Sequence, residues 1–261
     1  MWAFAAGLAV AALVAGCGHE TWRRGDAMRA GSADQLGEDR LSMHWRFSTA
    51  DRLTEVEPQE FAGAAVYADT VFIGSASGWF FALRSSTGAI RWRKQLGAVM
   101  CAPVIVAGVL HVGTADGALL ALDSQTGAEK WRYQSRGPIE QSPASTGDLI
   151  VFSNEADQVV AVDAVSGKFK WQYKGETPEE YTLRGHAGVT IDNDLIYTGF
   201  SNGTLVALRK DTGSVAWSTS LKGDAERFMD VDATPIVLGQ VLYASSSSGG
   251  VYALDKMTGL V

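Results

Sequence analysis

The sequence predicts an all-β chain that folds as a β-propeller of four-stranded antiparallel blades, and three observations support this prediction. A short motif that ends in Thr-Gly or Ser-Gly, with a Trp four residues later, recurs along the chain. Each copy is preceded by short apolar runs that turn residues separate. The 29 Gly residues far outnumber the 6 Pro residues, and Gly supplies the positive φ that tight hairpin turns need.

The repeated motif has the form Ala-x-x-x-x-Thr-Gly, with Ser in place of Thr in one copy. Its glycines are spaced by 39, 40, 46 and 46 residues and are Gly88, Gly127, Gly167, Gly213 and Gly259. The first four copies are each followed by a Trp, namely Trp92, Trp131, Trp171 and Trp217. A repeat of about 40 residues is typical of one propeller blade.

The second unit contains the four strands that a blade requires. Its predicted strands are Pro103–Ala107, Val109–Thr114, Ala118–Asp123 and Glu129–Gln134, with a Gly in each turn between them. One such sheet cannot bury both of its faces alone, so neighbouring blades must stack. We therefore interpret the repeated Trp as a ring that fills the seam between adjacent blades. A row of ligand-binding Trp residues is the alternative interpretation.

The propeller is expected to occupy residues 41–261 and to be partial. The fifth motif reaches Gly259, but the chain stops at Val261, two residues before the position of the Trp. We therefore favour about five blades of a larger propeller. In the alternative interpretation, the early strand Leu41–Phe47, which carries Trp45, completes the fifth blade and closes a ring of five.

The N-terminus resembles that of a bacterial lipoprotein. Residues 1–16 carry no charge and are short for a membrane-spanning helix, which favours a signal peptide. The small residues Ala15 and Gly16 before Cys17 resemble a lipobox, so Cys17 is the expected site of acylation and the membrane anchor. An uncleaved anchor helix is the alternative, since no Lys or Arg precedes the apolar run. Residues 17–40 are expected to form a flexible tether.

The remaining composition excludes several classes of function. The formal net charge is −7 and no long run of Lys or Arg occurs, so a nucleic-acid partner is not expected. The cysteines Cys17 and Cys101 stand far apart, and the histidines are scattered. We therefore predict no catalytic residue, no metal site and no cofactor.

The repeat is interrupted in two places, and interruptions of a regular pattern are typical functional sites. The two spacings of 46 residues place about six extra residues in each of two connections, Gly175–Arg184 and Lys222–Asp232. Each connection joins the outer strand of one blade to the inner strand of the next. Both should therefore open on the same face of the propeller, close to each other.

Two family resemblances follow from these residues. The pattern Ala-x-Asp-x-x-Thr-Gly-x-x-x-Trp resembles the repeat of pyrroloquinoline-quinone (PQQ) type propellers. Leu183-Arg184-Gly185 and Asp230-Val231-Asp232, in the two connections, are similar to segments of the BamB family, the lipoprotein propellers of the outer-membrane β-barrel assembly machinery. This resemblance implies eight blades in all and an outer-membrane location, facing the periplasm. It also implies binding to BamA, the barrel-inserting subunit, through a set of five residues: Tyr181, Leu183, Arg184, Asp230 and Asp232.

The chemistry of these residues suits a protein interface. Arg184 offers a planar fork of hydrogen-bond donors. Asp230 and Asp232 are two residues apart, so on an extended segment they are expected to face the same way. Tyr181 and Leu183 alternate in the same manner and could supply an apolar anchor, although Tyr181 replaces an aliphatic residue of the family. The alternative is an internal Arg–Asp pair that only fixes the two connections.

The hypothesis is therefore a non-catalytic scaffold lipoprotein that binds BamA and offers strand edges to unfolded outer-membrane proteins. A general envelope adaptor with another partner is one alternative. A PQQ-dependent dehydrogenase is the other, but the resemblance to those enzymes implies an adjacent pair of cysteines and a calcium site, and the sequence has no Cys-Cys pair.

Overall fold

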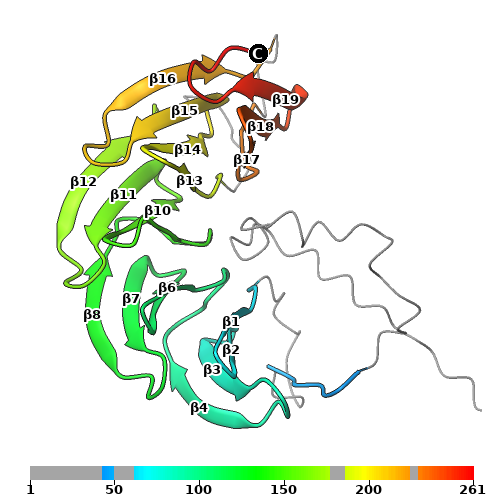
Figure 1. Cartoon of the computed structure of the whole chain (residues 1–261), viewed down its shortest axis with the longest axis vertical. Helices are drawn as coiled ribbons and strands as arrows, with labels where there is room; N and C mark the ends of the chain where they lie inside the picture. Colours follow the sequence, from blue (N-terminus) through cyan, green and yellow to red (C-terminus); the bar gives the residue numbers. More distant parts are fainter. Residues whose placement is uncertain (1–42, 50–61, 177–185, 224–228) are drawn as a thin grey trace, which may run out of the picture.

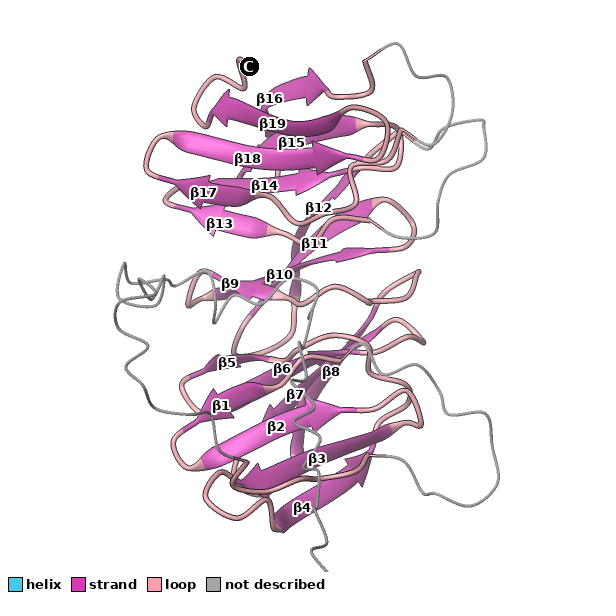
Figure 2. Cartoon of the chain, turned by 90° about the vertical axis from the view of Figure 1, so that its right-hand side faces the viewer, coloured by secondary structure: helices cyan, strands magenta, loops and turns pink. Residues whose placement is uncertain are grey.

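A computed structural model describes residues 43–49, 62–176, 186–223 and 229–261 of the chain. These residues contain 19 β-strands in five antiparallel sheets and no helix. The sheets follow one another around an open arc (Figure 1) and stack face to face along it (Figure 2). The prediction of an all-β propeller is confirmed.

The strands are grouped by their position within each sheet. The innermost strands are β1 (Ala65–Tyr67), β5 (Val104–Val106), β9 (Ala144–Ser145), β13 (Thr190–Asp192) and β17 (Ile236–Leu238). The second strands are β2 (Thr70–Gly74), β6 (Val109–Gly113), β10 (Leu149–Asn154), β14 (Leu195–Gly199) and β18 (Val241–Ser246). The third strands are β3 (Trp79–Arg84), β7 (Ala118–Asp123), β11 (Gln158–Asp163), β15 (Thr204–Arg209) and β19 (Gly250–Asp255). The outer strands are β4 (Ile90–Gln95), β8 (Glu129–Gln134), β12 (Phe169–Lys174) and β16 (Val215–Ser220).

Each sheet is one blade, and we number the blades 1 to 5 along the chain. In blades 1 to 4 each strand pairs with the next one along the chain, whereas the sheet of blade 5, formed by β17, β18 and β19, has three strands. Strands β7 and β8 have the predicted bounds, and β5 and β6 are slightly shorter than predicted. The outer strands run along the circumference of the arc and the innermost strands lie inside it (Figure 1).

The hydrophobic core is divided into four clusters, one for each pair of neighbouring blades. Phe72 and Phe80 of blade 1 pack with Leu120 of blade 2, and the other three pairs have equivalent clusters. Such a core explains why strands in the middle of the arc are buried on both faces. Strand β10, for example, is buried at every position.

The repeated Trp and the repeated Gly meet in the seam between blades. The ring of Trp92 in blade 1 lies against Gly127 of blade 2, where an added Cβ would come within 2.9 Å of the ring, and its Nε1 donates a hydrogen bond of 3.1 Å to the carbonyl of Ser124. The rings of Trp131, Trp171 and Trp217 lie in the same way against Gly167, Gly213 and Gly259. Each Trp ring therefore lies between two neighbouring blades, at the position that the sequence interpretation gave it.

Residues 43–49 occupy the place of an outer strand in front of blade 1. Trp45 donates a hydrogen bond of 2.7 Å to the carbonyl of Ser85 and lies against Gly88, as each later Trp does in its own seam. Exposed and partly buried positions alternate here in the order found in β4. This segment lies beside blade 1, at the other end of the arc from blade 5 (Figure 1), so the described residues do not close a ring of five.

Candidate partner-binding site

The two long connections follow the outer strands of blades 3 and 4. The first runs from β12 to β13 and the second from β16 to β17, in both cases from an outer strand to the next innermost strand, as predicted. Tyr181, Leu183 and Arg184 of the first connection lie outside the described residues. Asp230 and Asp232 of the second connection lie within them.

The ends of the two connections are joined to each other. The backbone N–H of Gly188, in the first connection, donates a hydrogen bond of 3.1 Å to Oγ1 of Thr234 in the second. Two residues further on, the hydroxyl of Thr190 donates to the carbonyl of Pro235. An equivalent hydrogen bond of 3.2 Å joins Ala102 to Ser142 between blades 2 and 3, so this contact belongs to the repeat. The expectation that Gly175–Arg184 and Lys222–Asp232 lie close together stays a prediction, because 177–185 and 224–228 lie outside the described residues.

The first connection is also fixed to blade 3 directly after the described chain resumes. Nδ1 of the buried His186 lies 3.3 Å from a carboxylate oxygen of Glu155, in the turn between β10 and β11. The carbonyl of Ala187 accepts a hydrogen bond of 2.7 Å from the hydroxyl of Ser153. His186 had no predicted role. The only feature of the sequence that could have pointed to a role for His186 was its position directly after Leu183-Arg184-Gly185.

Asp230 and Asp232 differ in their exposure, so the expectation that they face the same way is wrong. Asp230 is only 1% exposed, whereas Asp232 is exposed. The reason is that the segment between them is not an extended strand. Val231 inserts against Gly199, where an added Cβ would lie 2.2 Å from Cγ1 of Val231, and its N–H donates to the carbonyl of Phe200.

The backbone of Asp230 is held by blade 5. Its carbonyl accepts hydrogen bonds from the N–H and the hydroxyl of Ser247, at 2.9 and 3.2 Å. Ala98 and Pro138 use their carbonyls in the same way in earlier connections, so this contact belongs to the repeat and not to the extra residues. The geometry gives Asp230 a place inside the loop and leaves Asp232 on the surface.

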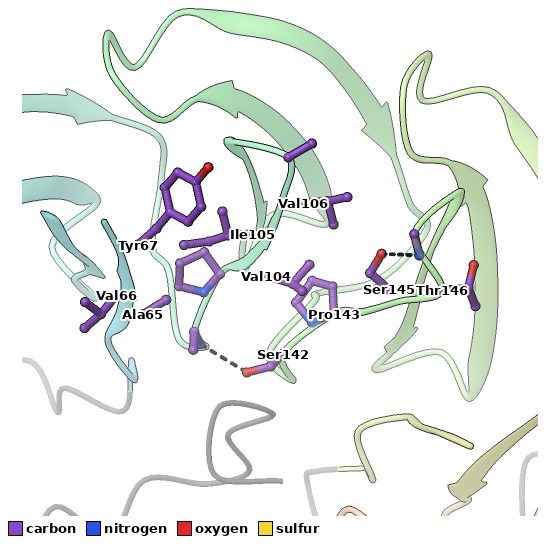
Figure 3. A pocket seen from close by; sticks show the side chains of 14 residues that line it. Ala65, Val66, Tyr67, Val104, Ile105, Val106, Ser142, Pro143, Ser145 and Thr146 are labelled. Atoms are coloured by element: carbon purple, nitrogen blue, oxygen red, sulfur yellow. Dashed lines mark hydrogen bonds between the residues drawn. The ribbon is translucent and has the colours of Figure 1, made fainter. Parts of the chain in front are cut away.

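A hollow lies on the inner wall of the arc, apart from the two connections. It measures about 460 Å³ and is lined by residues of β1, β5 and β9 and by residues directly before and after β5 and β9 (Figure 3). Its lining includes Val66, Tyr67, Val104, Ile105 and Pro143. The 14 lining residues include no carboxylate, amine or imidazole group, and their polar side chains are the hydroxyls of Tyr67, Ser142, Ser145 and Thr146.

The His, Cys, Asp and Glu side chains of the described residues are scattered rather than clustered. They include no group of three or more His, Cys, Asp or Glu side chains that could hold a metal ion. Cys101 is buried at the start of blade 2, and its burial raises the pKa of the thiol to about 12. A thiol that stays protonated at neutral pH is not a nucleophile. No helix in the described part of the chain is long and apolar enough to span a membrane.

The comparisons with known proteins agree with this architecture. Two overlapping matches to the family model described as outer membrane protein assembly factor BamB cover residues 9–139 and 94–260. The crystal structure of BamB from Moraxella catarrhalis is similar over 78% of this chain and 64% of its own, with 26% identity and a TM-score of 0.67. A europium-containing methanol dehydrogenase has a TM-score of 0.68 and 21% identity over 84% of this chain and 52% of its own, which shows the shared fold alone.

Curated relatives extend the match across most of the chain. BamB of Shewanella oneidensis is 26% identical over 205 residues, 77% of this chain and 42% of its own length. BamB of Yersinia pestis is 23% identical over 241 residues, 90% of this chain and 50% of its own length. The chain thus spans half or less of these curated relatives.

The fold and the repeat together define a propeller of PQQ-type blades with two enlarged connections. Since the family model matches nearly the whole chain, the chain belongs to the family of the outer membrane protein assembly factor BamB.

Proposed function

We propose that this chain is a non-catalytic scaffold lipoprotein of the outer-membrane β-barrel assembly machinery. Acylated Cys17 anchors it to the outer membrane after removal of the signal peptide, and the blades face the periplasm. The names of its relatives support a role in outer-membrane protein assembly. Cys17 and the apolar residues before it support the anchor.

The periplasmic region of BamA binds across the two long connections in this proposal. The observation that supports it is that the two connections belong to consecutive blades, and their described ends meet at Gly188 and Thr234, as the equivalent residues Ala102 and Ser142 do between blades 2 and 3. Arg184, Leu183 and Tyr181 supply contacts from the first connection. Asp232 is exposed and supplies a contact from the second, whereas the buried Asp230 holds that connection in shape.

Unfolded outer-membrane proteins are the second class of partner. An extended segment can add to an exposed strand edge through backbone hydrogen bonds. The innermost strands are only two or three residues long, which is poor for such pairing, but the outer strands have six residues each. The circumference of the arc is therefore the better place for a substrate strand.

A dehydrogenase function has less support, although such enzymes share the fold. The single cysteine among the described residues, Cys101, is buried, and Cys17 is too distant in sequence to be its adjacent partner. An adaptor for a different envelope protein differs from our proposal only in the partner, so the identity of the partner decides between them.

The test is co-purification from solubilised outer membrane with the full chain as bait. Arg184→Ala and Asp232→Ala should each lower the recovery of BamA by about tenfold or more, as expected for central interface residues. Asp211→Ala is the matched control, because Asp211 is an exposed carboxylate in a turn at the opposite side of blade 4. Equal recovery with all variants would refute the site, and absence of BamA with the parent chain would refute the function.

A further inference from the structure

The outer rim of blades 1 to 3 carries a band of positive charge on an acidic chain. Eight exposed or partly exposed cations lie on β4, β8, β12 and the segment 43–49: Arg46, Arg91, Arg93, Lys94, Lys130, Arg132, Lys170 and Lys174. The only acidic residue on these strands is Glu129. The equivalent strand of blade 4, β16, has no charged residue, so the band is not a property of every outer strand.

Half of these cations are neutralised by neighbouring carboxylates. Arg91, Lys130, Arg132 and Lys170 form ion pairs with Asp69, Asp123, Glu129 and Asp163. Arg46, Arg93, Lys94 and Lys174 form no ion pair with any other residue that the structure describes. The eight cations thus outnumber the four carboxylates that pair with them, so the rim has an excess of positive charge, whereas the whole chain has a net charge of −7.

Aromatic and apolar side chains accompany the cations. Cζ of Arg93 lies 4.6 Å from the ring centroid of Trp79, a partly exposed residue where the other blades have Ala, Gln, Thr or Gly. Ile90 at the start of β4 is 47% exposed, and Phe169 at the start of β12 is 51% exposed. Cations beside Trp and other apolar side chains match the boundary between lipid headgroups and acyl chains.

We propose that this rim binds the phosphate groups of an anionic lipid surface, so that the arc lies with blades 1 to 3 edge-on to the membrane. The guanidinium groups of Arg46 and Arg93 have the fork geometry that pairs with phosphate oxygens. The proposal rests on the lipid anchor of the proposed function, which brings the rim to the membrane. The described chain begins at Met43 beside blade 1, so the connection to Cys17 enters at one end of the band.

The test measures partition of the full chain between buffer and vesicles of phosphatidylcholine, with or without phosphatidylglycerol. The apolar residues 1–16 contribute equally to all variants. The parent should favour the anionic vesicles by about tenfold or more at low salt, and this preference should fall as salt rises. Arg93→Glu with Lys174→Glu should remove most of the preference.

The matched control is Arg209→Glu with Lys222→Glu, which makes the same change in charge at exposed positions outside the band. It should keep the preference. An equal loss in both double variants would show an effect of net charge only and overturn the proposal. No preference by the parent would also overturn it and would leave an acidic protein as the partner of the rim. Neither result depends on binding to BamA, which is absent from the vesicle experiment, so the proposed function would be judged separately.

Discussion

The Ala, the Gly and the Trp of the repeated motif are all explained by the packing of the Trp ring in the seam between blades. Each ring pairs across its own sheet with a small residue, as Trp131 does with Ala121, and it covers a Gly of the next blade. That Gly also has a positive φ, which is 70° at Gly127. The motif therefore keeps Ala, Gly and Trp because larger residues at the first two positions would displace the third.

We predict that Gly127→Ala lowers the free energy of unfolding more than Gly239→Ala, which strains the backbone without a steric clash. A left-handed conformation costs a non-Gly residue about 1–2 kcal/mol, and overpacking against the Trp92 ring adds about 1–3 kcal/mol. Gly239→Ala is the matched control, since Gly239 has a similar φ of 62° with no atom within 4 Å of an added Cβ. Denaturant unfolding of both variants measures the difference, and equal losses would contradict the role of the ring.

The failed expectation for Asp230 and Asp232 also belongs to single residues. Alternation of faces holds only in a strand, and the segment from Asp230 to Thr234 forms none. The repeat offered a better guide, because Val99, Ile139 and Val231 each lie four residues before a Pro and each packs against a Gly at the end of a second strand. Comparing the connections with one another would have assigned Val231 to the interior.

The turn that follows the third strand is stabilised in three blades by hydrogen bonds to an Asp side chain. In blade 3, Oδ1 of Asp163 accepts hydrogen bonds from the N–H groups of Val165 and Ser166 and from the hydroxyl of Ser166. Asp123 and Asp255 do the same in blades 2 and 5, but Arg84 and Arg209 replace the Asp in blades 1 and 4. The carboxylate therefore stabilises the turn, but the turn also forms without it.

We predict that Asp163→Ala lowers the melting temperature at neutral pH. The hydrogen bonds from Ser166, with Lys170 nearby, lower the pKa of the Asp163 carboxyl to about 2. Because the folded-state pKa is below the ordinary value of about 3.8, the carboxylate stabilises the fold above that pH and loses this effect as the pH falls through about 2. The parent and the variant should converge in acid, as thermal melts at several pH values would show.

Arg209→Ala is the control for this element, because Arg209 occupies the same turn position in blade 4. It should leave the melting temperature almost unchanged at every pH. A loss equal to that of Asp163→Ala would mean that the side chain acts through packing and not through its carboxylate.

Strand positions were predictable because the repeat fixes the turns. β5 is shorter than predicted for a physical reason at each end: Pro103 has no N–H for the ladder, and Ala107 has a φ of 47° in the hairpin turn with Gly108. The extra residues of the two connections have no copy elsewhere in the chain. Their presence could be read from the spacing, but the contact of His186 with Glu155 directly after the first connection could not.

At the scale of the whole molecule, the arc is a chain of blades that contact only their neighbours. Its core clusters each bridge one pair of blades, and no cluster spans three. In such an architecture each blade is stabilised by its contacts with its neighbours, so a destabilising substitution at one end of the arc should lower the stability of the nearest blade only. The sequence predicted this order of blades, since the spacing of the motif gives the number of units and the Trp gives the contact between them.

The last prediction tests this locality with the two Trp residues near the ends of the described arc. Trp45→Ala removes the hydrogen bond to Ser85 and the cover over Gly88, so amide hydrogen exchange should accelerate by roughly tenfold to a hundredfold in blade 1. Blade 5 should keep its protection. Trp217→Ala removes the equivalent contacts with Lys256 and Gly259 and should expose blade 5 while blade 1 stays protected. Faster exchange through all five blades in either variant would show that the arc unfolds as one cooperative unit, and nearest-neighbour packing would then not describe its stability.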